Sequence, residues 1–157
     1  CAYKIDMIIV RDKHAGVPRK IADVSGAHVI DAGDGKHQHP TQALLDLYSI
    51  WEVKGDLAGL KVGVVGDIGH SRVCGAPYPS LREYNMLYGL TKDREHLMKP
   101  DALICHPGPI NRGVELDSYM ADHPKRSVIL DQVYAGILTR MAEMYLLLGG
   151  SEDGLTA

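Results

Sequence analysis

Short apolar runs alternate with longer segments of helical periodicity along this chain. Runs of apolar residues predict strands at 5–10, 28–30, 61–65 and 102–105. Helical spacing predicts helices at 18–23, 40–53, 82–88, 92–97 and 132–148. Strands that alternate with helices are typical of an α/β protein with a parallel sheet, and such sheets bind ligands beyond the carboxyl ends of their strands.

The predicted helix at 40–53 is apolar on more than one face. Leu44 and Trp51 share one stripe, but Leu45 and Ile50 add apolar surface elsewhere on the helix. We therefore expect little of this helix to face water, and we interpret it as a helix packed between two larger units.

Composition narrows the class of protein. With 157 residues, 45% of them hydrophobic and 24% charged, the chain has the make-up of an ordinary globular protein. A formal net charge of -3 argues against a broad basic surface for nucleic acid, and no apolar run is as long as the roughly 20 residues of a membrane span. The cysteines follow no C-x-x-C spacing, which fits reduced thiols, and no secretory signal is visible. We therefore expect a cytoplasmic protein.

A glycine-bearing turn at 31–36 leads into the helix that begins near Pro40. Backbone N–H groups at a helix start favour an anion, and His39 and Gln42 lie close enough to face the same ligand. A small substrate with a carbonyl, an amide nitrogen and a phosphate would suit them. Taken alone, the two residues are equally well explained as a helix cap and a solvated glutamine. His37 and His39 lack the further ligands of a closed metal site, so we expect no metal.

Three longer strings carry a more specific signal. Residues 31–47 read DAGDGKHQHPTQALLDL, residues 65–73 read VGDIGHSRV, and residues 106–115 read HPGPINRGVE. In this order they resemble the aspartate carbamoyltransferase catalytic chains of the aspartate/ornithine carbamoyltransferase family, and residues 132–150 resemble the closing helix of that family. The resemblance implies an enzyme that moves the carbamoyl group of carbamoyl phosphate to the α-amine of L-aspartate in pyrimidine biosynthesis, without a cofactor.

The resemblance also implies an α/β fold of two doubly wound parallel-sheet domains joined by an interdomain helix. Residues 1–55 and 131–157 would belong to the carbamoyl-phosphate-binding domain, including the linking helix 40–53, and residues 56–130 would belong to the aspartate-binding domain. The family implies a homotrimer with active sites shared between neighbours. A regulatory subunit or a dihydroorotase would be candidate further partners.

Individual roles follow from the same resemblance. The residues implied to bind carbamoyl phosphate are Arg11, His39, Gln42, Gly108 and Pro109. Arg11 and His39 would be catalytic, because they would stabilise charge that develops on oxygen. Gln42 and the backbone carbonyls of the two turn residues would accept hydrogen bonds from the carbamoyl nitrogen, and Arg72 would bind a carboxylate of aspartate. Considered singly, such arginines are more often surface ion-pair residues.

The chain departs from the family in what it leaves out. It contains no Ser-Thr-Arg-Thr phosphate loop, no lysine-bearing loop of the kind that a neighbouring subunit lends, and no Arg-x-Gln-x-x-Arg segment. Pieces that the family separates by long stretches also follow one another directly after Val73 and after Pro77. We therefore expect that the sequence joins segments of a longer polypeptide, with breaks near these two residues.

Three alternatives stay open at the level of sequence. An ornithine carbamoyltransferase shares the H-P-T-Q motif, but its second-substrate motif resembles His-Cys-Leu-Pro, whereas this chain has HPGP at 106–109. A noncatalytic carbamoyltransferase-like scaffold would also lack the phosphate loop. A nucleotide-binding α/β domain is the plainest alternative, although Gly63, Gly66 and Gly69 do not follow the G-x-G-x-x-G spacing.

Overall fold

The computed structural model describes residues 4–64 and 80–150, and the chain divides into two compact units. Unit 1 comprises Cys1–Val53 and Val133–Ala157, and unit 2 comprises Lys54–Gln132. These boundaries lie close to those expected for the two domains, whereas the substrate that each unit binds stays a prediction. Within the described ranges, the structure contains no helix with the length and apolar character needed to cross a membrane.

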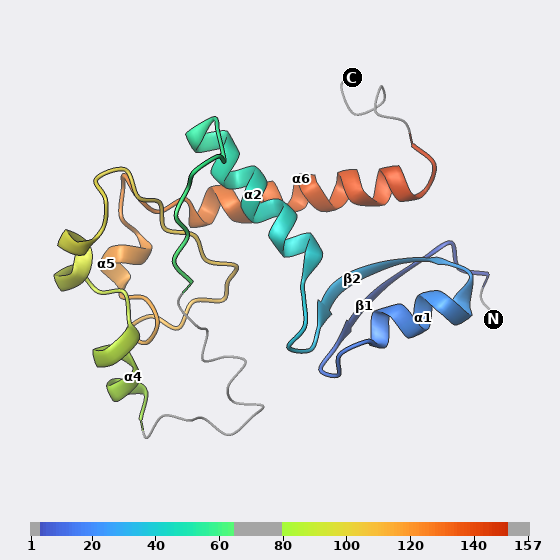
Figure 1. Ribbon diagram of the computed structural model, residues 1–157, viewed down its shortest axis with the longest axis horizontal. Coiled ribbons are helices and arrows are strands. Elements are labelled where there is room, and N and C mark those ends of the chain that lie inside the picture. The colour runs from blue at the N-terminus through green and yellow to red at the C-terminus, as the bar shows by residue number, and fades with distance from the viewer. Residues whose placement is uncertain (1–3, 65–79, 151–157) are drawn as a thin grey trace. The chain divides into compact units, whose positions relative to one another are not determined.

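Unit 1 begins with a parallel β-α-β arrangement. Strands β1 (Met7–Asp12) and β2 (His28–Asp34) pair in parallel, and helix α1 (Val17–Ser25) connects them along one face of the pair (Figure 1). Glycines in the left-handed region bound the helix, Gly16 with φ 88° and Gly26 with φ 67°, a conformation that other residues rarely adopt. The predicted strands at 5–10 and 28–30 and the helix at 18–23 are thus confirmed, with longer bounds for the second strand and the helix.

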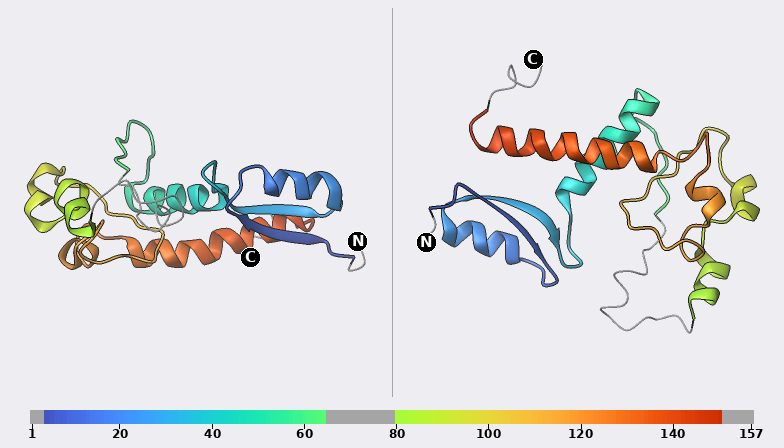
Figure 2. Two further views of the ribbon diagram at one scale, coloured as in Figure 1. Left: turned by 90° about the horizontal axis from the view of Figure 1, so that it is seen from below. Right: turned by 180° about the vertical axis from the view of Figure 1, so that it is seen from behind.

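Two long helices complete unit 1. Helix α2 (Pro40–Lys54) and helix α6 (Ile129–Leu147) cross one another in Figures 1 and 2. The crossing is close, since a Cβ at Gly136 of α6 would lie 3.3 Å from the Cδ2 atom of Leu45 of α2. Leu45 is buried there, but Trp51 on another face of α2 is 52% exposed. The expectation that little of α2 faces water is therefore wrong for the described chain, because the crossing covers only part of its apolar circumference.

Unit 2 is built from short elements around a small core. Its helices are α4 (Leu81–Tyr88), the 3₁₀ helix η1 (Lys92–Leu97) and α5 (Ser118–Ala121). The buried core comprises Ile104, Leu116, Met120, Ala121 and Ile129. Ser80 begins α4 as an N-cap, since its hydroxyl accepts the backbone N–H of Glu83 at 3.1 Å.

Two predicted strands of unit 2 are wrong for the described residues. Residues 61–64 form no strand, and the run at 102–105 contributes only an isolated bridge between Ile104 and Ser127. A β-strand needs a neighbouring strand to complete its backbone hydrogen bonds. The described part of unit 2 forms isolated bridges and no continuous ladder of such bonds. The segment at 102–105 is still anchored, because Ile104 exchanges backbone hydrogen bonds with Arg126 at 2.8 Å and Val128 at 3.0 Å.

Replacing Gly89 with Ala should lower the free energy of unfolding by about 2 kcal/mol, the usual cost of overpacking. Gly89 is buried, and a Cβ at this position would lie 2.7 Å from the carbonyl oxygen of Val114 and 2.8 Å from that of Asn85. Urea unfolding measures the loss. Gly63→Ala is the matched control, since a Cβ at Gly63 meets no atom of the described residues within 4 Å. Equal stability of the two variants would contradict the prediction.

Candidate functional site

Arg11 lies near the carboxyl end of β1 and extends over the neighbouring strand. A Cβ at Gly33 of β2 would lie 3.3 Å from Cγ and 3.5 Å from Nε of Arg11, so the glycine leaves room for the arginine side chain. Gly33 has φ 131°, and its N–H donates to the Asp31 carboxylate at 2.9 Å. Arg11 is exposed, which leaves its guanidinium accessible to an anion.

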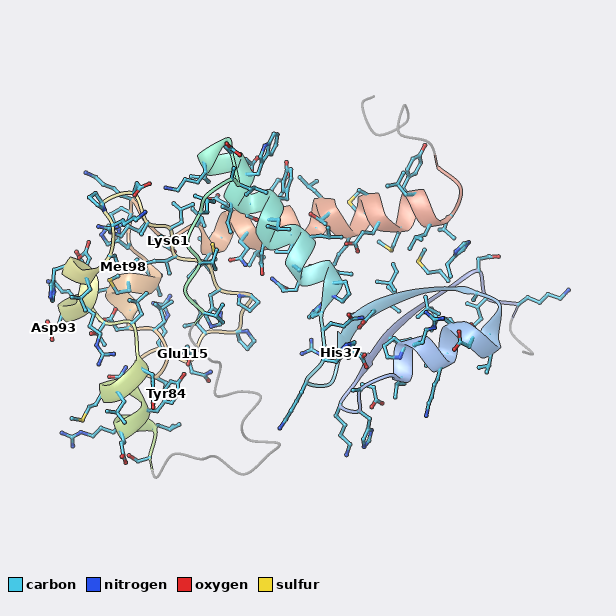
Figure 3. The ribbon with its side chains drawn as sticks, in the orientation of Figure 1. His37, Lys61, Tyr84, Asp93, Met98 and Glu115 are labelled. Carbon is cyan, nitrogen blue, oxygen red and sulfur yellow. The ribbon has the colours of Figure 1, made fainter. Side chains whose placement is uncertain are left out.

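The loop between β2 and α2 is fastened by the buried carboxylate of Asp34. Its Oδ1 atom accepts the N–H of Gly16 at 2.7 Å, and its Oδ2 atom lies 3.0 Å from Nδ1 of His37, which Figure 3 labels in this loop. Gly35 has φ 58° and lies close in space to Lys13, so that a Cβ at position 35 would be 2.7 Å from the Lys13 carbonyl oxygen. This loop therefore delivers residue 39 to α2 in a defined conformation.

His39 stands immediately before α2, half-buried, with its Nδ1 atom 3.2 Å from the hydroxyl of Thr41. Burial, and the positive charges of Arg11 and Arg140, lower the pKa of His39 below its usual range, while the carboxylate of Asp31 and that of Asp46 oppose the shift. The imidazole is therefore neutral at pH 7. The hydroxyl of Thr41 can either donate to Nδ1 or accept from it, and in the tautomer where it donates, the ring proton is on Nε2 and can be donated to a ligand.

Gln42 lies one turn into α2 and makes a hydrogen bond along the same helix. Its Nε2 atom donates to Oδ1 of Asp46 at 2.8 Å. Both side chains are partly buried. Gln42 was predicted as a site residue from the sequence, and Asp46 was not. Residues four positions apart lie next to one another on a helix face, so the spacing could have predicted this contact.

Arg140 of α6 is the second positive charge that acts on His39, and no role was predicted for it. Its Nη1 atom donates to the carbonyl of Gly136 at 3.2 Å, so the side chain folds back along its own helix. A Cβ at position 136 would lie 2.8 Å from Nη1 of Arg140. Because α6 begins 117 positions after the end of β1, at residue 129 against residue 12, only the fold could reveal that Arg140 and Arg11 act on the same imidazole.

The HPGP turn at 106–109 lies in unit 2. Gly108 has φ 69°, its peptide bond to Pro109 is cis, and both residues are exposed, which leaves their carbonyl oxygens accessible. His106 is buried beneath the turn. Its ring Nδ1 atom accepts the backbone N–H of Gly108 at 2.8 Å, and its backbone N–H donates to Oε1 of Gln132 at 2.8 Å.

Glu115 closes this arrangement from below. The carboxylate is 5% exposed and is labelled in Figure 3. Its Oε1 atom accepts the N–H of Asn111 at 2.6 Å and lies 3.3 Å from Nε2 of His106. Its Oε2 atom is buried and finds no hydrogen-bond partner among the described residues. The supporting roles of His106, Glu115 and Gln132 were not predicted, since no local sequence pattern relates these residues.

The structure thus brings Arg11, His39 and Gln42 into unit 1 and places Gly108 and Pro109 in unit 2. After burial, the charge of Arg11 is the largest influence that lowers the pKa of His39. The predicted aspartate ligand Arg72, together with the expected breaks near Val73 and Pro77, lies outside the described residues. The individual roles of all six site residues stay predictions.

Comparison with known proteins gives consistent results. Residues 1–52 match the family described as "Aspartate/ornithine carbamoyltransferase, carbamoyl-P binding domain". The aspartate carbamoyltransferase catalytic subunit of Syntrophotalea carbinolica is 40% identical, in a match that covers 96% of this chain and 67% of that protein. The chain therefore spans about two thirds of the length of this relative.

Solved structures share the fold. Aspartate transcarbamoylase from Trypanosoma cruzi, in complex with carbamoyl aspartate and phosphate, has a TM-score of 0.76 at 18% identity and is covered to 66%, with 92% of this chain included. Ornithine carbamoyltransferase from Pyrococcus furiosus has a TM-score of 0.77 at 22% identity and is covered to 68%, with 95% of this chain included. The two TM-scores are nearly equal, so these structural similarities show the α/β carbamoyltransferase fold and do not distinguish between the second substrates of the two enzymes.

The match to the Syntrophotalea carbinolica protein extends over 210 aligned positions, at least 53 more than the 157 residues of this chain. Positions of that relative inside the matched part therefore have no counterpart here. This gap is compatible with the expected joining of separate segments, whose positions stay a prediction. Because a catalytic subunit at 40% identity matches nearly all of the chain, the chain belongs to the aspartate/ornithine carbamoyltransferase family of enzymes and is similar to its aspartate carbamoyltransferase catalytic subunits.

Proposed function

We propose that the polypeptide carrying this chain transfers the carbamoyl group of carbamoyl phosphate to the α-amine of L-aspartate, giving N-carbamoyl-L-aspartate and phosphate for pyrimidine biosynthesis. The observation that supports this most is the arrangement of His39 and Gln42 at the amino end of α2, with Arg11 close enough to act on His39. Helix N–H groups at this end also favour an anion. The similar Syntrophotalea carbinolica protein bears the name of this enzyme, and the Trypanosoma cruzi structure holds carbamoyl aspartate and phosphate.

The reaction needs no protein nucleophile. The neutral amine of aspartate attacks the carbonyl carbon, a C–N bond forms, and the C–O bond to phosphate then breaks. The amine proton leaves with the phosphate, whose oxygens are basic enough to accept it. Arg11 and neutral His39 would donate hydrogen bonds to the carbonyl oxygen as it gains negative charge, which is the usual role of an oxyanion site.

The remaining roles concern orientation of the two substrates. Gln42 would accept a hydrogen bond from the carbamoyl nitrogen through its amide oxygen, together with the carbonyls of Gly108 and Pro109. Arg72 would bind a carboxylate of aspartate in a paired contact. Correct positioning of two reactants lowers the barrier strongly. The family resemblance implies that the active enzyme is a homotrimer in which neighbours complete each site, a state that light scattering would test.

The deciding experiment assays the full-length polypeptide in parallel with two substrate pairs, carbamoyl phosphate with aspartate and carbamoyl phosphate with ornithine. We expect carbamoyl transfer to aspartate and none to ornithine. Preferred transfer to ornithine would make the protein an ornithine carbamoyltransferase, whose fold fits equally well.

Calorimetry with a bisubstrate analogue, a phosphonate joined to an aspartate-like dicarboxylate, separates an enzyme from a noncatalytic scaffold. The analogue should bind far more tightly than carbamoyl phosphate, because the entropy of bringing two ligands together is already lost. Absence of both transfer and tight binding would indicate the scaffold.

A further inference from the structure

The hydrogen bond between Gln42 and Asp46 has a direction that chemistry imposes. An ionised carboxylate only accepts hydrogen bonds, whereas a primary amide presents two N–H donors on one side and an oxygen acceptor on the other. The side of the Gln42 amide that lies 2.8 Å from Oδ1 of Asp46 is therefore its nitrogen. The amide oxygen of Gln42 therefore points away from the carboxylate of Asp46, and this oxygen is the end that can accept a hydrogen bond from a ligand.

We propose that Asp46 is a positioning residue that holds the Gln42 amide with its oxygen toward the carbamoyl nitrogen, and that it thereby lets the site distinguish an –NH₂ group from a methyl group. This inference rests on the proposed function, which assigns Gln42 to the carbamoyl group. Asp46 itself touches no reacting atom in this scheme.

The support beneath the pair is rigid. Between the two residues, Leu45 is 3% exposed and packs where α6 crosses, and Ser49 on the next turn is 2% exposed and donates to the Leu45 carbonyl at 2.7 Å. These contacts hold the helix backbone, and the orientation of the Gln42 amide decides which of its two ends faces the ligand. A carboxylate four residues later removes that choice.

Loss of Asp46 would release the amide. With no acceptor at position 46, the amide can turn its N–H groups toward the ligand, where they would meet the N–H groups of a carbamoyl ligand instead of accepting from them. A ligand with a methyl group in place of –NH₂ has no such hydrogen bond to lose. The expected effect is therefore a change in discrimination between two ligands and not a general loss of binding.

The experiment measures binding of two stable phosphonates to the full-length polypeptide by calorimetry. Phosphonoacetamide carries the –CO–NH₂ group, and phosphonoacetone carries –CO–CH₃ in its place. We expect the wild-type protein to prefer the amide and Asp46→Leu to lower that preference about fivefold, the equivalent of one hydrogen bond of about 1 kcal/mol. The lost negative charge of Asp46 strengthens binding of both anions, so it cancels in the ratio.

Three further variants show whether Asp46 acts through Gln42. In Asp46→Asn, an amide can pair with the Gln42 amide in either direction, so the preference should fall partway while the shape is kept. In a Gln42→Leu background, Asp46→Leu should change the preference no further. Asp23→Leu on α1 is the matched control, because it removes a carboxylate from another pair four residues apart, Arg19 and Asp23 at 3.2 Å, and should leave the preference unchanged.

The outcomes are distinct. An unchanged preference in Asp46→Leu, or an equal change in the Gln42→Leu background, would overturn the positioning role and leave an ordinary helix pair. A wild-type protein that binds neither phosphonate would overturn both this role and the proposed function. A wild-type protein that discriminates between the phosphonates but does not carbamoylate aspartate would overturn the proposed function alone.

Discussion

Replacing His39 with Ala is expected to lower kcat for carbamoyl transfer about 100-fold, the typical cost of losing one donor to a developing oxyanion. The free energy of unfolding should change by less than about 1 kcal/mol, because within the described part of the chain the half-buried imidazole makes one hydrogen bond, to Thr41 at 3.2 Å. Steady-state assays with both substrates saturating, together with urea unfolding, measure the two quantities separately.

The main alternative is that His39 caps α2. In the structure, the backbone carbonyl of His39 accepts the N–H of Gln42 at 3.1 Å and that of Ala43 at 3.2 Å. An alanine keeps this carbonyl, so the helix start survives the substitution. Normal turnover with a large loss of stability would instead make the imidazole a structural cap. His28→Ala, at an exposed position of β2, is the control and should alter neither quantity.

The pH dependence of stability gives an independent check on His39. Its pKa is lowered in the folded protein, first by burial and then by the charges of Arg11 and Arg140. The unfolded chain therefore takes up a proton more readily, and stability is lost as pH falls from the ordinary histidine pKa of about 6.5 through the lower folded value. Relative to its stability at pH 7, His39→Ala should lose less than the wild-type protein over this interval.

The sequence predicted unit 1 better than unit 2 for a physical reason. The β1-α1-β2 arrangement and α2 are short-range structures, and their apolar runs, bounding glycines and proline at the start of α2 are visible in the sequence. In unit 2, the runs at 61–65 and 102–105 have the composition of strands, but strand formation depends on a partner distant in sequence. Apolar composition alone therefore predicted two strands that the described residues do not form.

The site shows the same division. Residues that a contiguous motif contains, such as His39 and Gln42, could be proposed from the sequence. Arg140 could not, because its influence on His39 depends on the fold of α6. The contact between His106 and Glu115 joins residues nine positions apart across an irregular turn, where no helical or strand period relates them. Local patterns therefore identified groups that would touch ligand and missed the groups that hold them.

Replacing Glu115 with Ala is expected to lower the free energy of unfolding by about 3 kcal/mol and to weaken binding of carbamoyl phosphate. The substitution removes the acceptor of the part-buried Asn111 N–H and the carboxylate that lies 3.3 Å from Nε2 of the buried His106, and each unsatisfied buried group costs about 1–3 kcal/mol. The proton of His106 must be on Nε2, because Nδ1 accepts the N–H of Gly108. Rotation of the imidazole to find a new acceptor would therefore break the turn at 106–109.

Glu115→Gln separates the hydrogen bonds from the charge. Its amide oxygen can replace Oε1 as acceptor for Asn111 and as the neighbour of His106 Nε2, and its nitrogen takes the place of Oε2, which has no hydrogen-bond partner to lose among the described residues. We expect this variant to lose less than about 1 kcal/mol and to bind carbamoyl phosphate normally. Urea unfolding at pH 7 and calorimetry measure both effects, with the exposed Glu83→Ala on α4 as a control. Equal losses in Glu115→Ala and Glu115→Gln would mean that the negative charge itself stabilises this turn, whereas stability retained in both would show that Glu115 does not hold it.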